Sequence, residues 1–306
     1  MIEEVGHLPD GRLVRRVRLS AGHASLEVLD LGAAVDSWRP KGSTRSVVVG
    51  LDGDVTARWQ HLDVYPGVVG GRYLGRIRDG RFVLDGTEWR LATNENGHTL
   101  HGGPAGFDRR TWAIEAVSAH SVTLDLVSVD GDQGFPGTLS ASVSYRVSED
   151  SVTVDLAATT DAPTVVNLGA HPYFDVGPEP MLTVPASRWL PVDDAKVPWP
   201  GSAPVDDSAV DARAGLVLGT GADLDVTLLV DGTGHRCMAR LAGPDGTVAV
   251  WGDQPALQLF TAGALGGVAL EAQRVPDGPN RRDAEAVLRP GATYRSHVEW
   301  HFSALR

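Results

Sequence analysis

The sequence predicts an all-β protein, built as a large antiparallel β-sandwich. Three observations lead to this prediction: apolar and polar residues alternate in several segments, glycine and proline recur along the chain, and convincing helical stretches are scarce. Alternation with a period of two gives a strand one apolar face and one wet face. Many strands with frequent turns and few helices are typical of an antiparallel sandwich or barrel.

The clearest strand covers residues 139–147, LSASVSYRV. Every second position from Leu139 is apolar or aromatic, and the positions between them are three serines and Arg146. The segment 148–150 provides a turn, and alternation resumes at Val152, so the two segments are predicted to form a hairpin. The other predicted elements are strands at 121–130, 182–192 and 294–302 and a short helix at 207–214.

Turn chemistry is spread along the chain and is not gathered into a linker. The segment GDQGFPG (131–137) is predicted to turn, because glycine tolerates positive φ and proline fixes φ. We see no low-complexity segment, no repeat of fixed period and no shift in composition that would mark a boundary. Residues 1–306 are therefore expected to form one domain.

Composition excludes several classes of function. The formal net charge of −12 repels nucleic acid and anionic membranes but does not hinder a neutral ligand. Cys237 is the single cysteine, so no intrachain disulfide forms, which fits a reducing compartment. The first residues lack the apolar stretch of a signal peptide, and no apolar run is long enough to span a membrane. We expect a cytoplasmic monomer or homodimer with neither nucleic-acid nor membrane partners.

The segment NGHTLHGG (96–103) raises the question of a metal site. On a strand, His98 and His101 would point to opposite faces and would not chelate well. Neither an HExxH nor a CxxC motif is present, so no metal is expected. The GxSxG elbow and the Walker loop are also missing, and GVVGGRYLGR (67–76) does not match a phosphate-binding glycine motif. Acid–base chemistry remains.

Two segments carry candidate acid–base groups. His171 lies in NLGAHPYFD, where the following Pro172 favours an extended backbone. Glu271 follows an apolar run, so it is either a surface residue at a strand end or a partly desolvated functional group. Either residue alone is more typical of a structural role than of a functional one.

Taken together, several segments resemble the aldose 1-epimerases, also called galactose mutarotases. The matching segments are GRYLGRI (71–77), NGHTLHGGPAGFDRRTW (96–112), GDQGFPGTL (131–139), AHPYFD (170–175), DLDVTLLV (223–230), PALQLFT (255–261), LEAQRVPD (270–277) and LRPGATY (288–294). The resemblance implies a galactose mutarotase-like supersandwich, which agrees with the strand pattern. It also implies an isomerase that interconverts the α and β anomers of a free aldose, such as galactose or glucose, without a cofactor.

The resemblance also implies roles for individual residues. His171 matches the general acid, Glu271 the general base, and His101 the histidine that contacts the sugar beside its ring oxygen. This chemistry suits the residue types. Opening the ring needs a proton on O5 and removal of the C1 hydroxyl proton, and a histidine can donate near neutrality while a carboxylate accepts. The resting state is either a charged His171–Glu271 pair or a pair that becomes charged when substrate binds.

The implied sugar contacts are Arg76, Asp225 and Gln258. Asp223 lies two residues before Asp225 and would point to the same strand face, so the pattern does not choose between the two aspartates. Many family members carry asparagine where this chain has Gly75, which leaves the preferred hexose open.

Three other functions fit parts of the sequence. A hexose-6-phosphate 1-epimerase would need a cationic pocket, for which Arg109, Arg110, Arg281 and Arg282 are available. A non-catalytic carbohydrate-binding protein could use the same fold, although it would not need both proton-transfer residues. A glycosidase commonly uses two carboxylates across the bond, whereas this chain offers one carboxylate candidate with a histidine.

Overall fold

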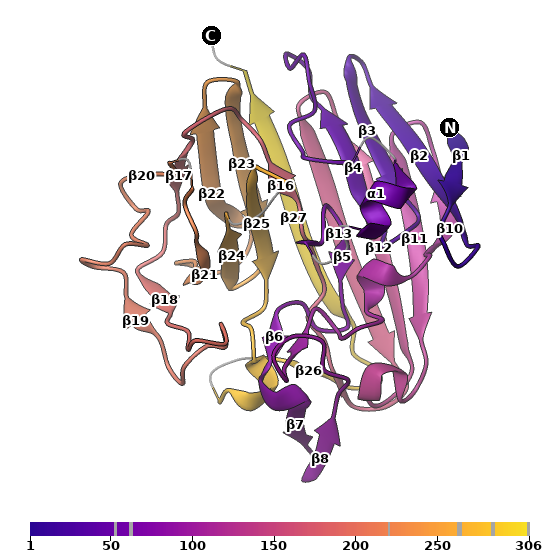
Figure 1. The fold of residues 1–306 in the computed structure, drawn as a ribbon, viewed down its shortest axis with the longest axis vertical. Coiled ribbons are helices and arrows are strands. Elements are labelled where there is room, and N and C mark those ends of the chain that lie inside the picture. Colours follow the sequence, from indigo (N-terminus) through magenta and orange to yellow (C-terminus); the bar gives the residue numbers. More distant parts are fainter. Residues whose placement is uncertain (52–53, 61–63, 220, 262–264, 283–284, 305–306) are drawn as a thin grey trace.

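The structure is a computed structural model, and it describes residues 1–51, 54–60, 64–219, 221–261, 265–282 and 285–304. Across these residues almost all regular structure is β-strand, and every strand pair in the three largest sheets is antiparallel (Figure 1). The prediction of an all-β antiparallel fold is therefore confirmed. None of the described helices has the length and apolar character needed to cross a lipid bilayer.

The largest sheet contains nine strands of the described chain. From edge to edge they are β10 (Ala113–Val117), β11 (Ser121–Ser128), β12 (Leu139–Val147), β13 (Ser151–Thr160), β27 (Tyr294–Ser303), β23 (Gly246–Gly252), β22 (Arg236–Gly243), β17 (Met181–Thr183) and β20 (Leu216–Val217). β12 has the predicted bounds, and its buried and more exposed residues alternate. It forms the predicted hairpin with β13, closed by Val147 opposite Val152.

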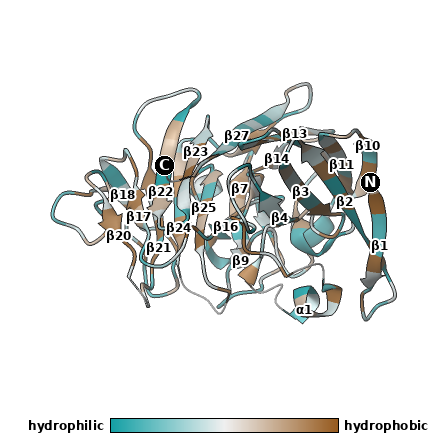
Figure 2. Ribbon diagram, turned by 90° about the horizontal axis from the view of Figure 1, so that it is seen from above, coloured by the Kyte–Doolittle hydropathy of each residue, from teal (hydrophilic) through white to brown (hydrophobic). Residues whose placement is uncertain are grey.

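Two smaller sheets pack on one face of the nine-stranded sheet. The first holds β1 (Ile2–His7), β2 (Leu13–Ala21), β3 (Ala24–Leu29) and β4 (Val35–Arg39). The second, in spatial order, holds β16 (Tyr173–Phe174), β25 (Val268–Gln273), β24 (Ala256–Phe260), β21 (Asp225–Leu229), β18 (Arg188–Leu190) and β19 (Ala203–Pro204). Figure 2 shows β13, β23 and β27 along one side of the molecule and β4, β16 and β25 on the other.

Trp300 of β27 joins the three sheets in one apolar core. Its ring lies edge-on to Phe174 of β16, with centroids 5.4 Å apart, and 6.3 Å from Trp38 of β4. All three side chains belong to the same buried cluster, and Trp300 is 1% exposed. Truncation of such a buried tryptophan to alanine typically costs about 3–5 kcal/mol, so Trp300 is a main packing point of the sandwich.

Short elements surround the sandwich. Small antiparallel pairs join β5 (Val69–Gly70) with β15 (Gly169–Ala170), β6 (Arg76–Ile77) with β9 (Thr99–Leu100), β7 (Arg81–Leu84) with β8 (Thr87–Arg90), and β14 (Thr164–Val165) with β26 (Val287–Leu288). The 3-10 turns are η2 (Arg78–Gly80), η3 (Phe107–Arg109), η4 (Asp132–Gly134) and η5 (Gly278–Asn280). η4 lies in the predicted turn segment, where Gly131 has φ 80°.

The predicted helix at 207–214 is wrong, since this segment forms turns. Asp207 has a left-handed backbone with φ 58°, which no helix interior accommodates. The Arg213 N–H bonds the Asp211 carboxylate at 3.1 Å, a local bond that competes with helix formation. The α-helix of the described chain is α1 (Val55–Gln60), which sequence reasoning missed, and Asp54 caps its N-terminus by accepting the Thr56 and Ala57 N–H bonds.

The remaining predicted strands are confirmed, with one change of interpretation. β11 and β27 lie within two residues of their predicted ends. The segment 182–192 is not one strand, because β17 belongs to the nine-stranded sheet and β18 to the six-stranded sheet. Pro185, between them, cannot donate a ladder hydrogen bond, which fits a chain that leaves one sheet for the other.

Candidate active site

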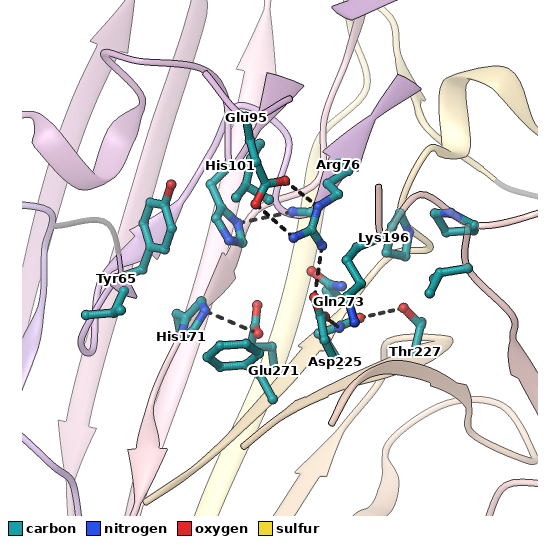
Figure 3. A pocket seen from close by; sticks show the side chains of 18 of the residues that line it. Tyr65, Arg76, Glu95, His101, His171, Lys196, Asp225, Thr227, Glu271 and Gln273 are labelled. Atoms are coloured by element: carbon teal, nitrogen blue, oxygen red, sulfur yellow. Dashed lines mark hydrogen bonds and ion pairs between the residues drawn. The ribbon is translucent and has the colours of Figure 1, made fainter. Parts of the chain in front are cut away.

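One cavity of about 130 Å³ is lined by all six residues that the sequence analysis selected: His101, His171, Glu271, Arg76, Asp225 and Gln258. They come from segments widely separated in sequence, and the fold brings them together over the six-stranded sheet (Figure 3). Small-molecule sites are typically concave and lined by a few convergent polar groups. Concave shape and convergent polar groups make this cavity the candidate active site.

Strand register builds the floor of the pocket. In β21, β24 and β25, Thr227 is opposite Gln258, and Gln258 is opposite Glu271. Side chains opposite one another in a ladder share a face of the sheet, and residues two positions along a strand share that face as well. The row therefore extends to Asp225, Phe260 and Gln273, which also line the cavity.

His171 and Glu271 are in direct contact at the bottom of the pocket. The distance from His171 Nε2 to Glu271 Oε1 is 3.3 Å, and the two residues are 4% and 2% exposed. The backbone holds His171 in place, because its N–H donates to the Val68 carbonyl at 2.9 Å and its carbonyl accepts from the Gly67 N–H at 3.0 Å. The imidazole is therefore fixed in front of the carboxyl group.

Burial moves the pKa values of this pair toward the neutral forms. Desolvation lowers the pKa of His171 to about 4 and raises the pKa of Glu271 well above its usual value. The Asp225 carboxylate raises the Glu271 pKa further, and the Arg76 guanidinium opposes that effect. Both shifts favour a neutral imidazole beside a protonated carboxyl group over the charged pair.

The same pair leaves polar atoms without protein partners. His171 Nδ1 and Glu271 Oε2 are buried and have no hydrogen-bond partner among the described residues. Gln273 also lines the pocket, and its side-chain nitrogen and oxygen are likewise buried without a hydrogen-bond partner among the described residues. Buried polar groups are nearly always hydrogen-bonded, so these atoms indicate a pocket built to receive a polar ligand or ordered water.

Gly75 and His101 hold each other through two reciprocal hydrogen bonds. The Gly75 N–H donates to His101 Nδ1 at 3.2 Å, and the His101 N–H donates to the Gly75 carbonyl at 3.2 Å. Because Nδ1 accepts, the neutral ring carries its proton on Nε2. Desolvation, with His171 and Arg76 nearby, keeps the His101 pKa well below its usual value, so the ring is neutral. Its centroid lies 5.5 Å from that of His171 and 4.3 Å from Tyr65.

Arg76 is the centre of a polar network on the other side of the pocket. Its guanidinium forms two bonds to Glu95, at 2.5 and 2.9 Å, and a third to Asp225 at 3.3 Å. Asp225 accepts a 2.6 Å bond from the Gln258 amide, and the Gln258 carbonyl accepts from the Thr227 hydroxyl. The cation is therefore balanced by two carboxylates, and the network presents preorganised donors and acceptors to a ligand (Figure 3).

The structure also distinguishes residues that the sequence left undecided. Asp225 lines the pocket, whereas Asp223 is exposed, precedes β21 and lines a separate cavity. The expectation that the two share a strand face is wrong, because the strand begins at Asp225. His98 lies outside the pocket, where its Nδ1 accepts the Asp79 N–H at 2.8 Å and a short bridge pairs it with Glu95.

Sequence reasoning missed several pocket residues: Tyr65, Glu95, Tyr173, Lys196, Thr227 and Gln273. Three of them lie two positions from a selected residue, namely Thr227, Tyr173 and Gln273. Strand alternation beyond Asp225 and Glu271 would have found Thr227 and Gln273. Tyr65 and Lys196 come from loops, where no periodic signal exists.

The four arginines considered for phosphate binding do not line this pocket. Arg281 and Arg282 line a different cavity, Arg110 pairs with Asp132 at 2.8 Å, and Arg109 lies 3.6 Å from Asp108. Lys196 and Arg76 are the basic residues in the described lining of the active-site pocket. Among the described residues, the one group of three His, Cys, Asp or Glu side chains close enough to share a metal ion lies elsewhere, on the outer face of the nine-stranded sheet.

Comparison with known proteins agrees with this picture. The family described as aldose 1-epimerase matches residues 15–301. The chain is 32% identical to the aldose 1-epimerase of Escherichia coli, with 97% of each chain covered, and 30% identical to human galactose mutarotase, with 96% of each covered. In fold it is similar to the crystal structure of galactose 1-epimerase from Lactobacillus acidophilus, with a TM-score of 0.88 at 23% identity over 100% of this chain and 99% of that one.

Proposed function

Because the chain belongs to the aldose 1-epimerase family, we propose that it is a mutarotase in which His171 and Glu271 transfer the protons. The proposed substrate is a free aldose such as galactose or glucose. The observation that carries the assignment of these two residues is their 3.3 Å contact at the bottom of the pocket. O5 and the C1 hydroxyl oxygen are bonded to the same sugar carbon, so a single pyranose can reach both groups.

In the proposed reaction, ring opening and closing use the same two groups in opposite directions. His171 donates a proton to O5 while Glu271 removes the proton from the C1 hydroxyl, and the C1–O5 bond breaks to give the open-chain aldehyde. Rotation about C1–C2 exposes the other face of the aldehyde. On closure, Glu271 returns its proton to the oxygen at C1 and His171 takes its proton back from O5. Each positioned acid or base typically contributes ~10²–10⁴-fold.

The raised Glu271 pKa and the lowered His171 pKa favour a neutral pair that carries the one proton this reaction needs. A neutral pair with the proton on Glu271 has the same proton count as a His171 cation beside a Glu271 anion. Burial favours the neutral form, whereas contact at 3.3 Å favours charging both groups together. We propose that the hydroxyl groups of the sugar stabilise the charged form, so substrate binding moves the proton to His171.

The remaining pocket residues are proposed to hold the sugar. Arg76, Asp225 and Gln258 form a connected network whose free faces would bind hydroxyl groups. The proposed role of His101 is to donate from Nε2 beside the ring oxygen, since its Nδ1 already accepts from Gly75. The unpartnered atoms of Gln273 would gain their hydrogen bonds from the ligand.

We further propose a cytoplasmic, single-domain protein that acts as a monomer or homodimer, without nucleic-acid or membrane partners.

Replacement of Glu271 by glutamine tests the proposal. Glu271→Gln keeps the shape of the side chain but removes the proton acceptor, so kcat is expected to fall by about 10²–10⁴-fold while sugar binding is nearly retained. Polarimetry on fresh α-galactose and α-glucose measures the rate, and calorimetric titration with the sugar measures binding. The matched control is Glu115→Gln, since Glu115 lies on the exposed edge strand β10.

Three results would contradict the proposal in different ways. A wild-type rate in Glu271→Gln would remove this residue from the mechanism. Sugar binding without any mutarotation by the native chain would favour a carbohydrate-binding protein. Faster turnover of glucose 6-phosphate than of glucose would favour a phosphate-reading epimerase.

A further inference from the structure

A second histidine–carboxylate cluster lies on the outer face of the nine-stranded sheet. Residues 297–301 of β27 read HVEWH, and alternation directs Val298 and Trp300 into the core. The alternate positions of the strand therefore lie on the outer face, and they are occupied by His297, Glu299 and His301. The active-site pocket is built on another sheet, and none of these three side chains lines it.

The cluster is tightly connected. His297 Nε2 lies 3.2 Å from Glu299 Oε1, and His301 Nε2 lies 2.8 Å from Glu299 Oε2. His235, just before β22, adds a third imidazole, whose centroid is 5.0 Å from that of His297. The ligand atoms of His235, His297 and Glu299 all lie within 4.8 Å of one another. Three imidazoles thus surround one carboxylate.

Asp155 fixes the orientation of His297. The Asp155 carboxylate, on the neighbouring strand β13, lies 2.6 Å from His297 Nδ1 and is its direct cross-strand partner. The other ring nitrogen, Nε2, faces the Glu299 carboxylate at 3.2 Å. In the metal-free chain a proton on Nε2 can bridge these two atoms, and a metal ion that displaces this proton would be held by the same pair. A carboxylate behind a histidine in this way is the usual outer partner of a metal-bound imidazole.

We propose that His235, His297 and Glu299 form a binding site for a divalent transition-metal ion, with Zn²⁺ as the ion tested. Imidazole nitrogen and carboxylate oxygen are ligands that zinc accepts in tetrahedral sites, with bonds of about 2.0–2.2 Å. Such bonds place neighbouring ligand atoms about 3.3–3.6 Å apart. The His297 and Glu299 ligand atoms are already near that separation, and the His235 ligand atom lies within 4.8 Å of both.

This proposal departs from the sequence-based expectation that the chain binds no metal. That expectation was based on the lack of an HExxH or CxxC motif. The proposed ligands come from one strand and from a loop that is distant in sequence, so no short motif encodes the site. The bound ion would tie the segment 231–235, which lacks strand or helix, to β27. The net charge of −12 and the nearby Asp155 carboxylate favour a cation here.

Zinc titration of the untagged, EDTA-treated and dialysed chain tests the site. Isothermal titration with ZnCl₂ is expected to show one site per chain, and zinc is expected to raise the melting temperature. Asp155→Asn is expected to weaken zinc binding by about 10–100-fold, because it removes the outer partner of His297. His235→Gln and His297→Gln are expected to weaken it at least as much. The matched control is His23→Gln, since His23 is exposed and lies outside the cluster.

The outcomes separate this site from the pocket. Circular dichroism in metal-free buffer establishes that each variant folds. Zinc binding that survives in both His235→Gln and His297→Gln would place the ion elsewhere and overturn the proposal, as would no saturable binding by the native chain. Zinc that binds through the pocket would be recognised because it inhibits mutarotation and competes with galactose, and that result would also overturn it.

Discussion

The molecule contains two histidine–glutamate contacts of nearly the same length: 3.3 Å between His171 and Glu271, and 3.2 Å between His297 and Glu299. The pKa values of the two histidines nevertheless shift in opposite directions. Desolvation dominates at His171 and lowers its pKa to about 4. Burial also lowers the pKa of His297, but hydrogen bonds to the Asp155 and Glu299 carboxylates outweigh it and raise the pKa overall.

Burial and the number of polar partners separate the two clusters. The pocket pair is almost completely buried, and each of its members keeps an unpartnered polar atom. The outer cluster is partly exposed, and both nitrogens of His297 face carboxylates. A histidine–glutamate contact is therefore poised for proton transfer only where the surroundings remove charge and leave hydrogen-bonding capacity for a ligand.

The largest expected effect comes from replacing the buried histidine. His171→Gln removes the group that protonates O5, and we expect kcat to fall by about 10²–10⁴-fold. Polarimetry under saturating galactose measures this loss. His120→Gln is a control on the surface, because His120 is exposed and its ring bonds the Ser20 carbonyl, far from the pocket residues. Equal activity in the two variants would show that His171 contributes no more to the reaction than an exposed histidine does.

Asp225→Asn is expected to have the next largest effect. The change removes the charge that binds Arg76 and Gln258, and a hydrogen bond to a charged group is worth about 1.5–3 kcal/mol. We expect the KM for galactose to rise by about 10–100-fold, with a smaller change in kcat. Asp223→Asn is the matched control, because Asp223 is exposed and lines another cavity. A larger effect in the control would reverse the assignment of the two aspartates.

The pH dependence should report the singly protonated pair. As pH falls through the His171 value of about 4, the pair gains a second proton and loses its base. As pH rises through the elevated Glu271 pKa, the pair loses its only proton and with it the acid. We expect a bell-shaped kcat/KM, declining about tenfold per unit below the acid limb. The uncatalysed rate is subtracted at each pH. An apparent pKa near 6.5 for the acid limb would show that burial does not lower the pKa of His171.

The smallest expected effect is a change in sugar preference at Gly75. Gly75 has φ 81°, which asparagine tolerates better than most residues, but an added Cβ would lie 3.2 Å from Pro276. Gly75→Asn would place an amide in the pocket, and we expect the galactose-to-glucose ratio of kcat/KM to change by roughly 3–10-fold, about the value of one hydrogen bond. Rates on both sugars measure the ratio, with Gly86→Asn as control, since Gly86 also has positive φ and nothing within 4 Å.

The strands were predictable where one face is buried and the other is wet. β12 keeps a strict period of two, so its bounds follow from the residues alone. The helix predicted at 207–214 failed because local side-chain bonds and a left-handed Asp207 decide that segment. The division of 182–192 between two sheets could not be predicted, because nothing in a local pattern says which sheet a short strand joins.

The pocket was predictable as a set of residues but not as a geometry. The family resemblance selected six side chains that do line one cavity. Their distances depend on strand register and on backbone contacts such as those between Gly75 and His101, which no short motif encodes. Glu95 illustrates the gap: it lies just before the histidine motif, yet its two bonds to Arg76 depend on how the β6–β9 pair folds.

The row formed by Thr227, Gln258 and Glu271 crosses three strands in fixed register. Sliding β24 by one residue would turn Gln258 to the opposite face and bring an apolar neighbour, Leu257 or Leu259, into its place. Insertions inside these strands would therefore abolish the site altogether. Lengthening the loops that contribute Tyr65 and Lys196 would reshape only the entrance. New sugar preferences in this lineage should accordingly arise by remodelling the rim around an unchanging floor.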